Sequence, residues 1–198
     1  MNRVSTGKTN QMDQFKNKYR IPSARAQWWD YGNDAAYFIT ICTKNRFHFF
    51  GKITDQKLFA SPAGDIAANI WYEIPAVFPY AQLGAFVVMP NHVHGIIIIE
   101  KTVSDVAVPL HPATRPKTGG FASCCNPMLN ENLSRIVRWY KGRCSFEIRK
   151  VNPAFQWQSR FHDHIIKNDA TYQRINDYIE NNPANWCKDK FSEHPTLP

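Results

Sequence analysis

The segment VVMPNHVHGIIII, residues 87–99, constrains the fold of this chain more than any other stretch. Its β-branched and aliphatic residues predict two strands, at about 84–89 and 92–100, that meet at a Pro-Asn pair. His92 and His94 are two residues apart, so on a strand both side chains point to one face while Val93 points to the other. Imidazoles among apolar residues are unfavourable to bury without partners. The pattern leaves two interpretations open, half-buried histidines with hydrogen-bond partners and the paired ligands of a divalent ion.

The other segments predict an α+β chain. Strand-forming residues run from position 36 and again over about 47–53. Ser61 can cap a helix that has Pro62 at its first position, and a further helix is expected over 131–150. The apolar stripe of that helix comprises Leu133, Ile136, Val137, Tyr140, Cys144 and Ile148.

The C-terminal third adds a strand over 155–167, broken near Ser159, and a last helix from Asn168 or Asp169 to Pro183. The order β, α, β, β, α, β, α favours a ferredoxin-like antiparallel sheet with helices packed on one face, and with the histidines on a central strand. We expect a basic arm over 1–33, a folded domain over 34–190 and a tail over 191–198, with a Pro/Gly-rich insertion loop at 101–127.

Composition limits the classes of function. The 198 residues suit one domain, and no run reaches the roughly 18 apolar residues of a membrane span. The polar N-terminus lacks a signal-peptide core, so we expect a cytoplasmic protein with no membrane partner. Five cysteines without a CxxC pair disfavour a zinc ribbon or a disulfide framework. The net charge of +8 fits a polyanionic partner without proving one.

The last helix carries a second group of candidate residues. Tyr178 and Asn182 are four positions apart, so a hydroxyl and an amide oxygen lie on one helical face. They are equally compatible with a half-buried aromatic and a C-terminal cap. A second histidine pair flanks Asp163, and a charge at that place indicates an edge strand or proximity to a site. We therefore keep Asp163 and His164 as possible secondary active-site residues.

Basic and aromatic residues provide candidates for nucleic-acid contacts. Cationic side chains could follow phosphates, and tryptophans such as Trp139 could stack on unpaired bases, although a solvated basic helix face explains the charges as well. The candidate DNA-binding residues are Arg135, Arg138, Lys141, Arg143, Trp157, Gln158 and Arg160.

Three ordered motifs, VVMPNHVHGIIII, WQSRFHDHIIKN and YIENNPANW, together with YFITICTKNR near the start, resemble the single-tyrosine HUH transposases. The resemblance is closest to the REP-associated tyrosine transposases. It implies a metal-dependent DNA transesterase that cleaves and rejoins single-stranded DNA beside hairpins. In that family two histidines and a polar residue one turn after the nucleophile bind the divalent ion, which here would be magnesium or manganese.

Carried over residue by residue, the ligands are His92, His94 and Asn182, and the nucleophile that forms a 5′-phosphotyrosine is Tyr178. Tyr140 is the alternative nucleophile, but the residue one turn after it is Cys144, a poor ligand for a hard ion. The expected partner is single-stranded DNA with a hairpin, bound by a monomer or a homodimer. The alternative function is a catalytically inactive or domesticated protein that binds hairpin DNA.

Overall fold

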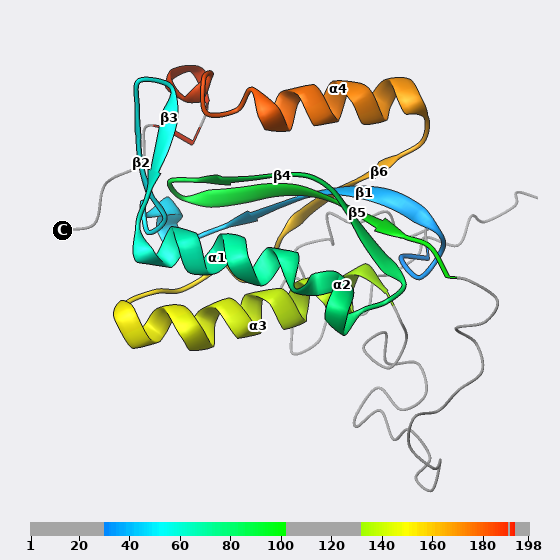
Figure 1. Ribbon diagram of the computed structural model, residues 1–198, viewed down its shortest axis with the longest axis horizontal. Coiled ribbons are helices and arrows are strands. Elements are labelled where there is room, and N and C mark those ends of the chain that lie inside the picture. The colour runs from blue at the N-terminus through cyan, green and yellow to red at the C-terminus, as the bar shows by residue number, and fades with distance from the viewer. Residues whose placement is uncertain (1–29, 102–131, 190, 193–198) are drawn as a thin grey trace, which may run out of the picture.

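The structure is a computed structural model that describes residues 30–101, 132–189 and 191–192. Its centre is a four-stranded antiparallel sheet of β1 (Ala35–Cys42), β4 (Ala81–Met89), β5 (His92–Ile99) and β6 (His162–Ile166). The order is β4-β5-β1-β6, so β5 is a central strand and β6 is an edge strand. The predicted α+β class and the central position of the histidine strand are confirmed (Figure 1).

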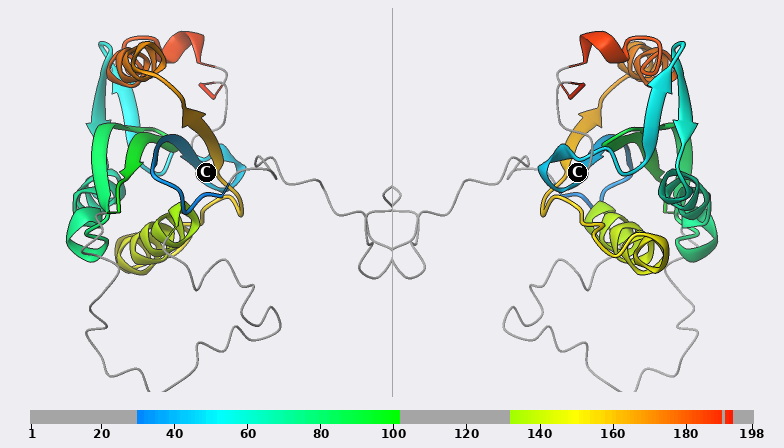
Figure 2. Two further views of the ribbon diagram at one scale, coloured as in Figure 1. Left: turned by 90° about the vertical axis from the view of Figure 1, so that its right-hand side faces the viewer. Right: turned by 90° about the vertical axis from the view of Figure 1, so that its left-hand side faces the viewer.

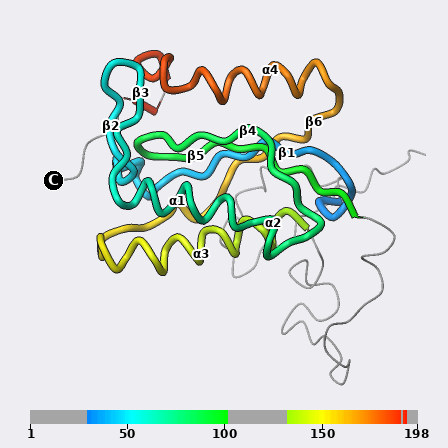
Figure 3. The backbone as a smooth tube through the Cα atoms, viewed as in Figure 1, coloured from blue at the N-terminus to red at the C-terminus, as the bar shows by residue number. Residues whose placement is uncertain are grey.

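Helices lie on both sides of this sheet. α1 (Pro62–Tyr72) and α3 (Leu133–Val151) lie side by side over one face, as the prediction required, and the short α2 (Ile74–Val77) follows α1. α4 (Asp169–Glu180) lies across the opposite face and contacts β4 and β5 (Figure 2). The backbone trace in Figure 3 shows the same three layers, with the four strands between α4 and the α1–α3 pair.

The main core lies between the sheet and the α1–α3 pair. All six residues of the predicted α3 stripe are buried there. Trp71 of α1 stacks on Phe86 at a centroid distance of 4.4 Å and meets Tyr140 edge-on at 5.4 Å. Gly95 allows the close approach of the indole, because a Cβ atom at this position would lie 2.3 Å from Trp71 Cζ2. The sheet is therefore fixed to the helices at the strand that carries both histidines.

Helix starts follow the predicted caps. The Ser61 side chain accepts a hydrogen bond from the Gly64 N–H, and Asn168 accepts one from Thr171. α1 ends at Tyr72, and the short α2 begins directly after Glu73. Pro75 has no backbone N–H to donate to the preceding turn, which explains the interruption.

Two regions differ more strongly from the sequence expectations. Residues 51–60 form a hairpin of β2 (Gly51–Thr54) and β3 (Lys57–Ala60), whose turn residues Asp55 and Gln56 have φ of 49° and 60°. The strand expected over 155–167 is regular only as β6, and Trp157 contributes a single bridge to Thr43. A break near Ser159 was predicted, but the loss of regular pairing before it was not.

Several predicted regions lie outside the described residues: the basic arm before residue 30, the insertion loop after Lys101, and the tail after Ser192. Phe191, which was assigned to that tail, is buried against Met89 and Trp186. Within the described ranges, no helix combines the length and the apolar character needed to cross a bilayer.

Candidate active site

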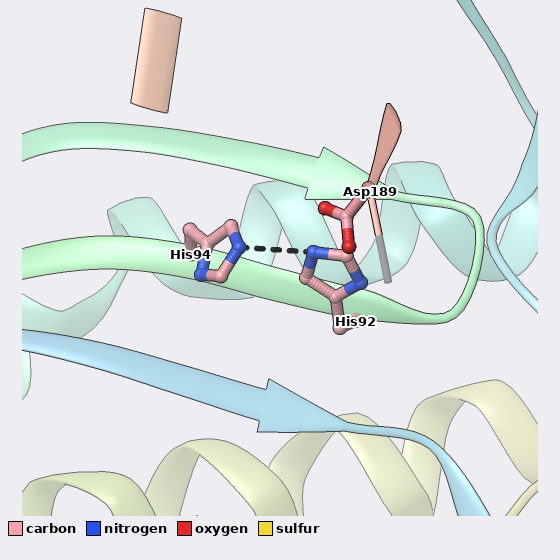
Figure 4. Close-up of side chains that lie close together, drawn as sticks. All are labelled: His92, His94 and Asp189. Carbon is pink, nitrogen blue, oxygen red and sulfur yellow. Dashed lines mark hydrogen bonds between the residues drawn. The ribbon is translucent and has the colours of Figure 1, made fainter. Parts of the chain in front are cut away.

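The two histidines lie side by side at the start of β5, on the face covered by α4. His92 pairs in register with Cys42 and Met89, and His94 with Thr40 and Val87. Both imidazoles are buried, and their Nε2 atoms are 3.0 Å apart (Figure 4). Val93 is buried in the opposite core, so the predicted alternation of side chains is confirmed.

Neighbouring side chains fix the orientation of both rings. The Asn91 amide donates from Nδ2 to the carbonyls of Arg46 and Phe191, so its Oδ1 faces His92 Nδ1 at 2.8 Å. His92 therefore carries its proton on Nδ1 and presents the Nε2 lone pair toward His94. Thr40 Oγ1 lies 2.8 Å from His94 Nδ1 and orients that ring in the same way. Such outer partners are what metal-binding histidines usually have.

Tyr178 and Asn182 approach the histidines from α4 and the turn that follows it. The Tyr178 hydroxyl is 3.4 Å from His94 Nε2, while 47% of the residue stays exposed to solvent. The pKa of Tyr178 is raised by partial burial; the Asn182 amide lowers it and the Asp189 carboxylate raises it. The tyrosine is therefore a protonated, accessible hydroxyl at neutral pH. The structure therefore brings the Tyr178 hydroxyl to His94, with the Asn182 amide beside that hydroxyl.

Asn182 is unusual among the buried polar residues of this site. It is 3% exposed, and no described residue donates a hydrogen bond to its Oδ1 atom. A buried amide oxygen without a partner is unfavourable by about 1–3 kcal/mol. The amide lies beside the Tyr178 hydroxyl, so a ligand bound there could satisfy this oxygen.

Asp189 is a member of the site that the sequence analysis missed. One carboxylate oxygen and one nitrogen from each of His92 and His94 all lie within 4.8 Å of one another (Figure 4). The turn after α4 and the 3₁₀ helix Trp186–Lys188 bring the carboxylate back over β5. The Phe191 N–H donates to Asp189 Oδ1, and the Phe191 ring lies 4.9 Å from that of His92. Asp189 is a single acidic residue in a polar segment, so no periodic pattern in the sequence indicated that it belongs to the site.

These donors fit a divalent ion. Imidazole nitrogens suit manganese and zinc, while carboxylate and amide oxygens suit magnesium and manganese. The group formed by His92, His94 and Asp189 could bind a metal ion.

Tyr140, the alternative nucleophile, lies on the other side of the sheet. It is fully buried in the α1–α3 core, and its hydroxyl donates to the Ala67 carbonyl at 3.0 Å. Burial raises its pKa well above the ordinary value, and the neighbouring Cys144 adds to the effect. The sheet separates Tyr140 from both histidines, so the geometry favours Tyr178.

The second histidine pair lies on the edge strand, as its central charge suggested. His162 and His164 are exposed and pair with Thr40 and Phe38, so they share the face of the candidate site. Asp163 points to the other face, where it accepts a hydrogen bond of 2.6 Å from Tyr31. The structure does not bring Asp163 to the site. His164 shares the face of the site but has no described contact with His92, His94 or Asp189.

The predicted DNA-binding residues fall into two separate groups. Arg135, Arg138 and Arg143 are exposed on α3, on the face opposite the histidines, and Trp139 packs against Phe78. The second group, around residues 156–160, lies beside the end of β1 next to the site, with Gln158 and Arg160 exposed.

Lys141 and Trp157, both predicted to bind DNA, instead connect α3 to the segment around residues 156–160. Lys141 Nζ donates to the carbonyls of Gln158 and Ser159, at 2.6 and 3.3 Å. Trp157 donates from Nε1 to the Lys141 carbonyl and packs on Phe50. Lys141 thus supports the backbone of the second group, a role that the sequence analysis did not anticipate.

Comparison with known proteins identifies relatives of the whole described fold. No family model matches the sequence. An uncharacterized protein of Haemophilus influenzae (strain Rd) is 36% identical over 173 residues, which cover 85% of this chain and 91% of the relative. A solved structure of a REP-associated tyrosine transposase bound to a REP hairpin superposes with a TM-score of 0.54 at 18% identity, over 87% of this chain and 81% of that one. The chain therefore belongs to one family with the Haemophilus influenzae protein, and its fold is that of the REP-associated tyrosine transposases.

Proposed function

We propose that the protein is a metal-dependent transesterase that cleaves and rejoins single-stranded DNA beside hairpins, with Tyr178 as nucleophile. The observation that carries the proposal is the 3.4 Å approach of the Tyr178 hydroxyl to His94 Nε2, within a group of converging nitrogen and oxygen donors. The hairpin as substrate is supported by the transposase of the same fold, whose structure contains a REP hairpin.

The chemistry conserves the number of phosphate ester bonds. The Tyr178 oxygen attacks the scissile phosphorus, and the bond from phosphorus to the 3′ oxygen breaks. The products are a 5′-phosphotyrosine and a 3′-hydroxyl, which takes up a proton as the tyrosine loses one. A divalent ion bound by His92, His94, Asn182 and Asp189 would polarise the phosphate and stabilise the developing charge. Because the covalent link retains the ester, a second strand can be joined without a nucleotide cofactor.

Residues around the site keep the reacting groups in place. Asn91 and Thr40 prevent rotation of the imidazoles, and the sheet anchors them through Gly95 and the core behind it. On α4, Ile179 is fully buried against Ile96 and Ile166, which positions Tyr178 one residue earlier. Precise placement matters because errors of about 1 Å reduce rates roughly a hundredfold.

A covalent-adduct assay tests this proposal. The protein is incubated with a hairpin oligonucleotide that has single-stranded flanks, with magnesium or manganese, and adducts are resolved on a denaturing gel. The His92→Ala, His94→Ala double variant should lose adduct by about 1000-fold, because a metal contributes several kcal/mol to the transition state. Circular dichroism should show an intact fold.

Two results would count against the mechanism. Undiminished adduct in the double variant, or in excess chelator, would exclude the metal from the reaction. Specific hairpin binding by the wild-type protein with no adduct under either ion would favour the catalytically inactive hairpin-binding alternative.

A further inference from the structure

A hollow of about 610 Å³ lies between the end of α2 and α3, on the side of the sheet opposite the candidate active site (Figure 1). We call it the α3 hollow. Its lining combines apolar and basic residues, and no carboxylate is among the described residues that line it. These residues are Val77, Phe78, Arg135, Arg138, Trp139, Gly142 and Arg143. A Cβ atom at Gly142 would meet nothing within 4 Å, so this side of the hollow is open.

The uncompensated positive charge of the α3 hollow is confined to one end. Arg143 Nη1 donates to Glu147 at 2.7 Å, and Arg143 Nε lies 3.9 Å from the Glu73 carboxylate. Arg135 and Arg138 are exposed and form no ion pair with any residue that the structure describes. The uncompensated charge therefore extends over about one helical turn and ends where two carboxylates begin.

Apolar side chains form the floor between these charges. Phe78 is buried and meets the half-buried Trp139 edge-on, with 5.7 Å between the ring centroids. Val77 is 44% exposed beside them, and the Arg135 guanidinium lies 6.0 Å from the centre of the Phe78 ring. A ligand on this floor would therefore bury an apolar group next to cationic hydrogen-bond donors. Tryptophan and arginine are the residues that most often anchor protein interfaces.

We propose that the α3 hollow binds a short acidic segment of another protein, with one large apolar side chain on Val77 and Trp139 and two carboxylates at Arg135 and Arg138. Charge complementarity carries this choice, because guanidinium groups bind carboxylates through paired hydrogen bonds. The hollow faces away from His92, so such a partner could be bound while the candidate active site remains accessible. The inference does not depend on the proposed function.

A nucleic-acid strand is the competing occupant, and the hollow matches it less well. Every nucleotide carries a phosphate, so a strand that follows α3 would pass from the unpaired arginines to Glu73 and Glu147. Unpaired bases stack on accessible ring faces, whereas Phe78 is buried and Trp139 packs against it. The α3 arginines are therefore better matched by a short segment with few charges than by a continuous phosphate backbone.

A peptide array tests the assignment with defined probes. The full-length protein is applied to short peptides in which aspartates surround one phenylalanine, leucine or tryptophan at varied spacing. Matched peptides carry alanine in place of the apolar residue, or asparagine in place of the aspartates. The tightest peptide is then measured by fluorescence anisotropy. Either replacement should weaken binding about tenfold, and Arg138→Ala in the protein should have an effect of the same size. Gly142→Leu should also weaken binding, because its side chain would occupy the open side of the hollow without changing charge.

Arg174→Ala is the charge-matched control, since Arg174 is exposed on α4 at the other side of the sheet, and it should bind the peptide as the wild type does. The inference is wrong if no peptide of the array binds, if the alanine-containing peptide binds as tightly as its parent, or if Arg174→Ala weakens binding as much as Arg138→Ala. Hairpin DNA whose affinity falls in Arg138→Ala, and which the acidic peptide does not displace, would assign the hollow to DNA and overturn the inference.

Discussion

The two faces of the sheet carry out different tasks with the same strands. Alternate residues of β5, Val93 to Ile99, pack into the large apolar core under α1 and α3. The intervening residues face α4, where a small cluster of Ile96, Ile166 and Ile179 adjoins the polar group around His92. One face is filled by apolar side chains, and the other holds the half-exposed Tyr178 beside buried nitrogen and oxygen donors.

This comparison explains how a polar site can be rigid. An isolated pair of buried imidazoles would be unfavourable and mobile, but the reverse side of the same backbone is fixed by Trp71 against Gly95. Stability is supplied by the core face, and the candidate active site is confined to the other. Substitutions on the two faces should therefore affect different measurements.

Removing the hydroxyl of one tyrosine on each face should give the largest contrast between adduct formation and stability. Tyr178→Phe should abolish adduct, a loss of at least about 1000-fold, because the attacking oxygen is removed. Its thermal stability should hardly change, since the residue is half exposed. Tyr140→Phe should retain adduct formation and lose about 1 kcal/mol of stability with its bond to Ala67. Mass spectrometry that locates the nucleotide on Tyr140 or Tyr172 would reverse the assignment.

Glycine substitutions sharpen the contrast on the stability side. Gly95→Ala places a methyl group against Trp71, which is confined by Phe86 and Tyr140, so unfolding free energy should fall by about 3 kcal/mol. Gly142→Ala on exposed α3 meets nothing within 4 Å and should raise stability by about 0.5–1 kcal/mol. Chemical denaturation measures both variants. If Gly95→Ala and Gly142→Ala had equal stabilities, the Trp71 indole would not fix the sheet.

The smallest of the three effects concerns Asp189. Asp189→Asn removes the negative charge but keeps the shape, so affinity for manganese should fall about tenfold while the melting temperature without metal stays within a few degrees. Isothermal titration calorimetry gives the affinity directly, and Asp177→Asn on exposed α4 serves as control. Unchanged manganese affinity would assign the ion to His92, His94 and Asn182 alone.

Periodic patterns and capping residues in the sequence predicted the regular helices and strands that depend on local interactions. The alternation around His92 predicted which face each β5 side chain occupies, and the stripe from Leu133 to Ile148 predicted the buried side of α3. Asn168 was a recognisable cap. Tyr178 and Asn182 could be grouped by their spacing of four residues, although α4 ends at Glu180 and Asn182 lies in the turn that follows.

Other features depend on contacts that are distant in sequence. The hairpin turn at Asp55 and Gln56 adopts left-handed conformations that are more usual for Asn-Gly, so the sequence contains no strong turn signal. Asp189 reaches the histidines through an irregular turn. The Lys141 ammonium is directed toward residues 158–159 because the carbonyls of Gln158 and Ser159 accept hydrogen bonds from it. Neither role could be inferred from the neighbouring residues in the chain.

The position of Asp189 and Phe191 so late in the chain has a genetic consequence. A premature stop codon after position 183 would leave intact the codons for all strands of the described residues and for α1, α3 and α4. It would remove Trp186, Asp189 and Phe191. Such an allele would encode a product that keeps the residues of the main core but has an altered metal-binding group. Surveys that score gene copies as intact by the presence of the histidine and tyrosine motifs would count it as functional, so the reading frame through codon 191 needs to be inspected as well.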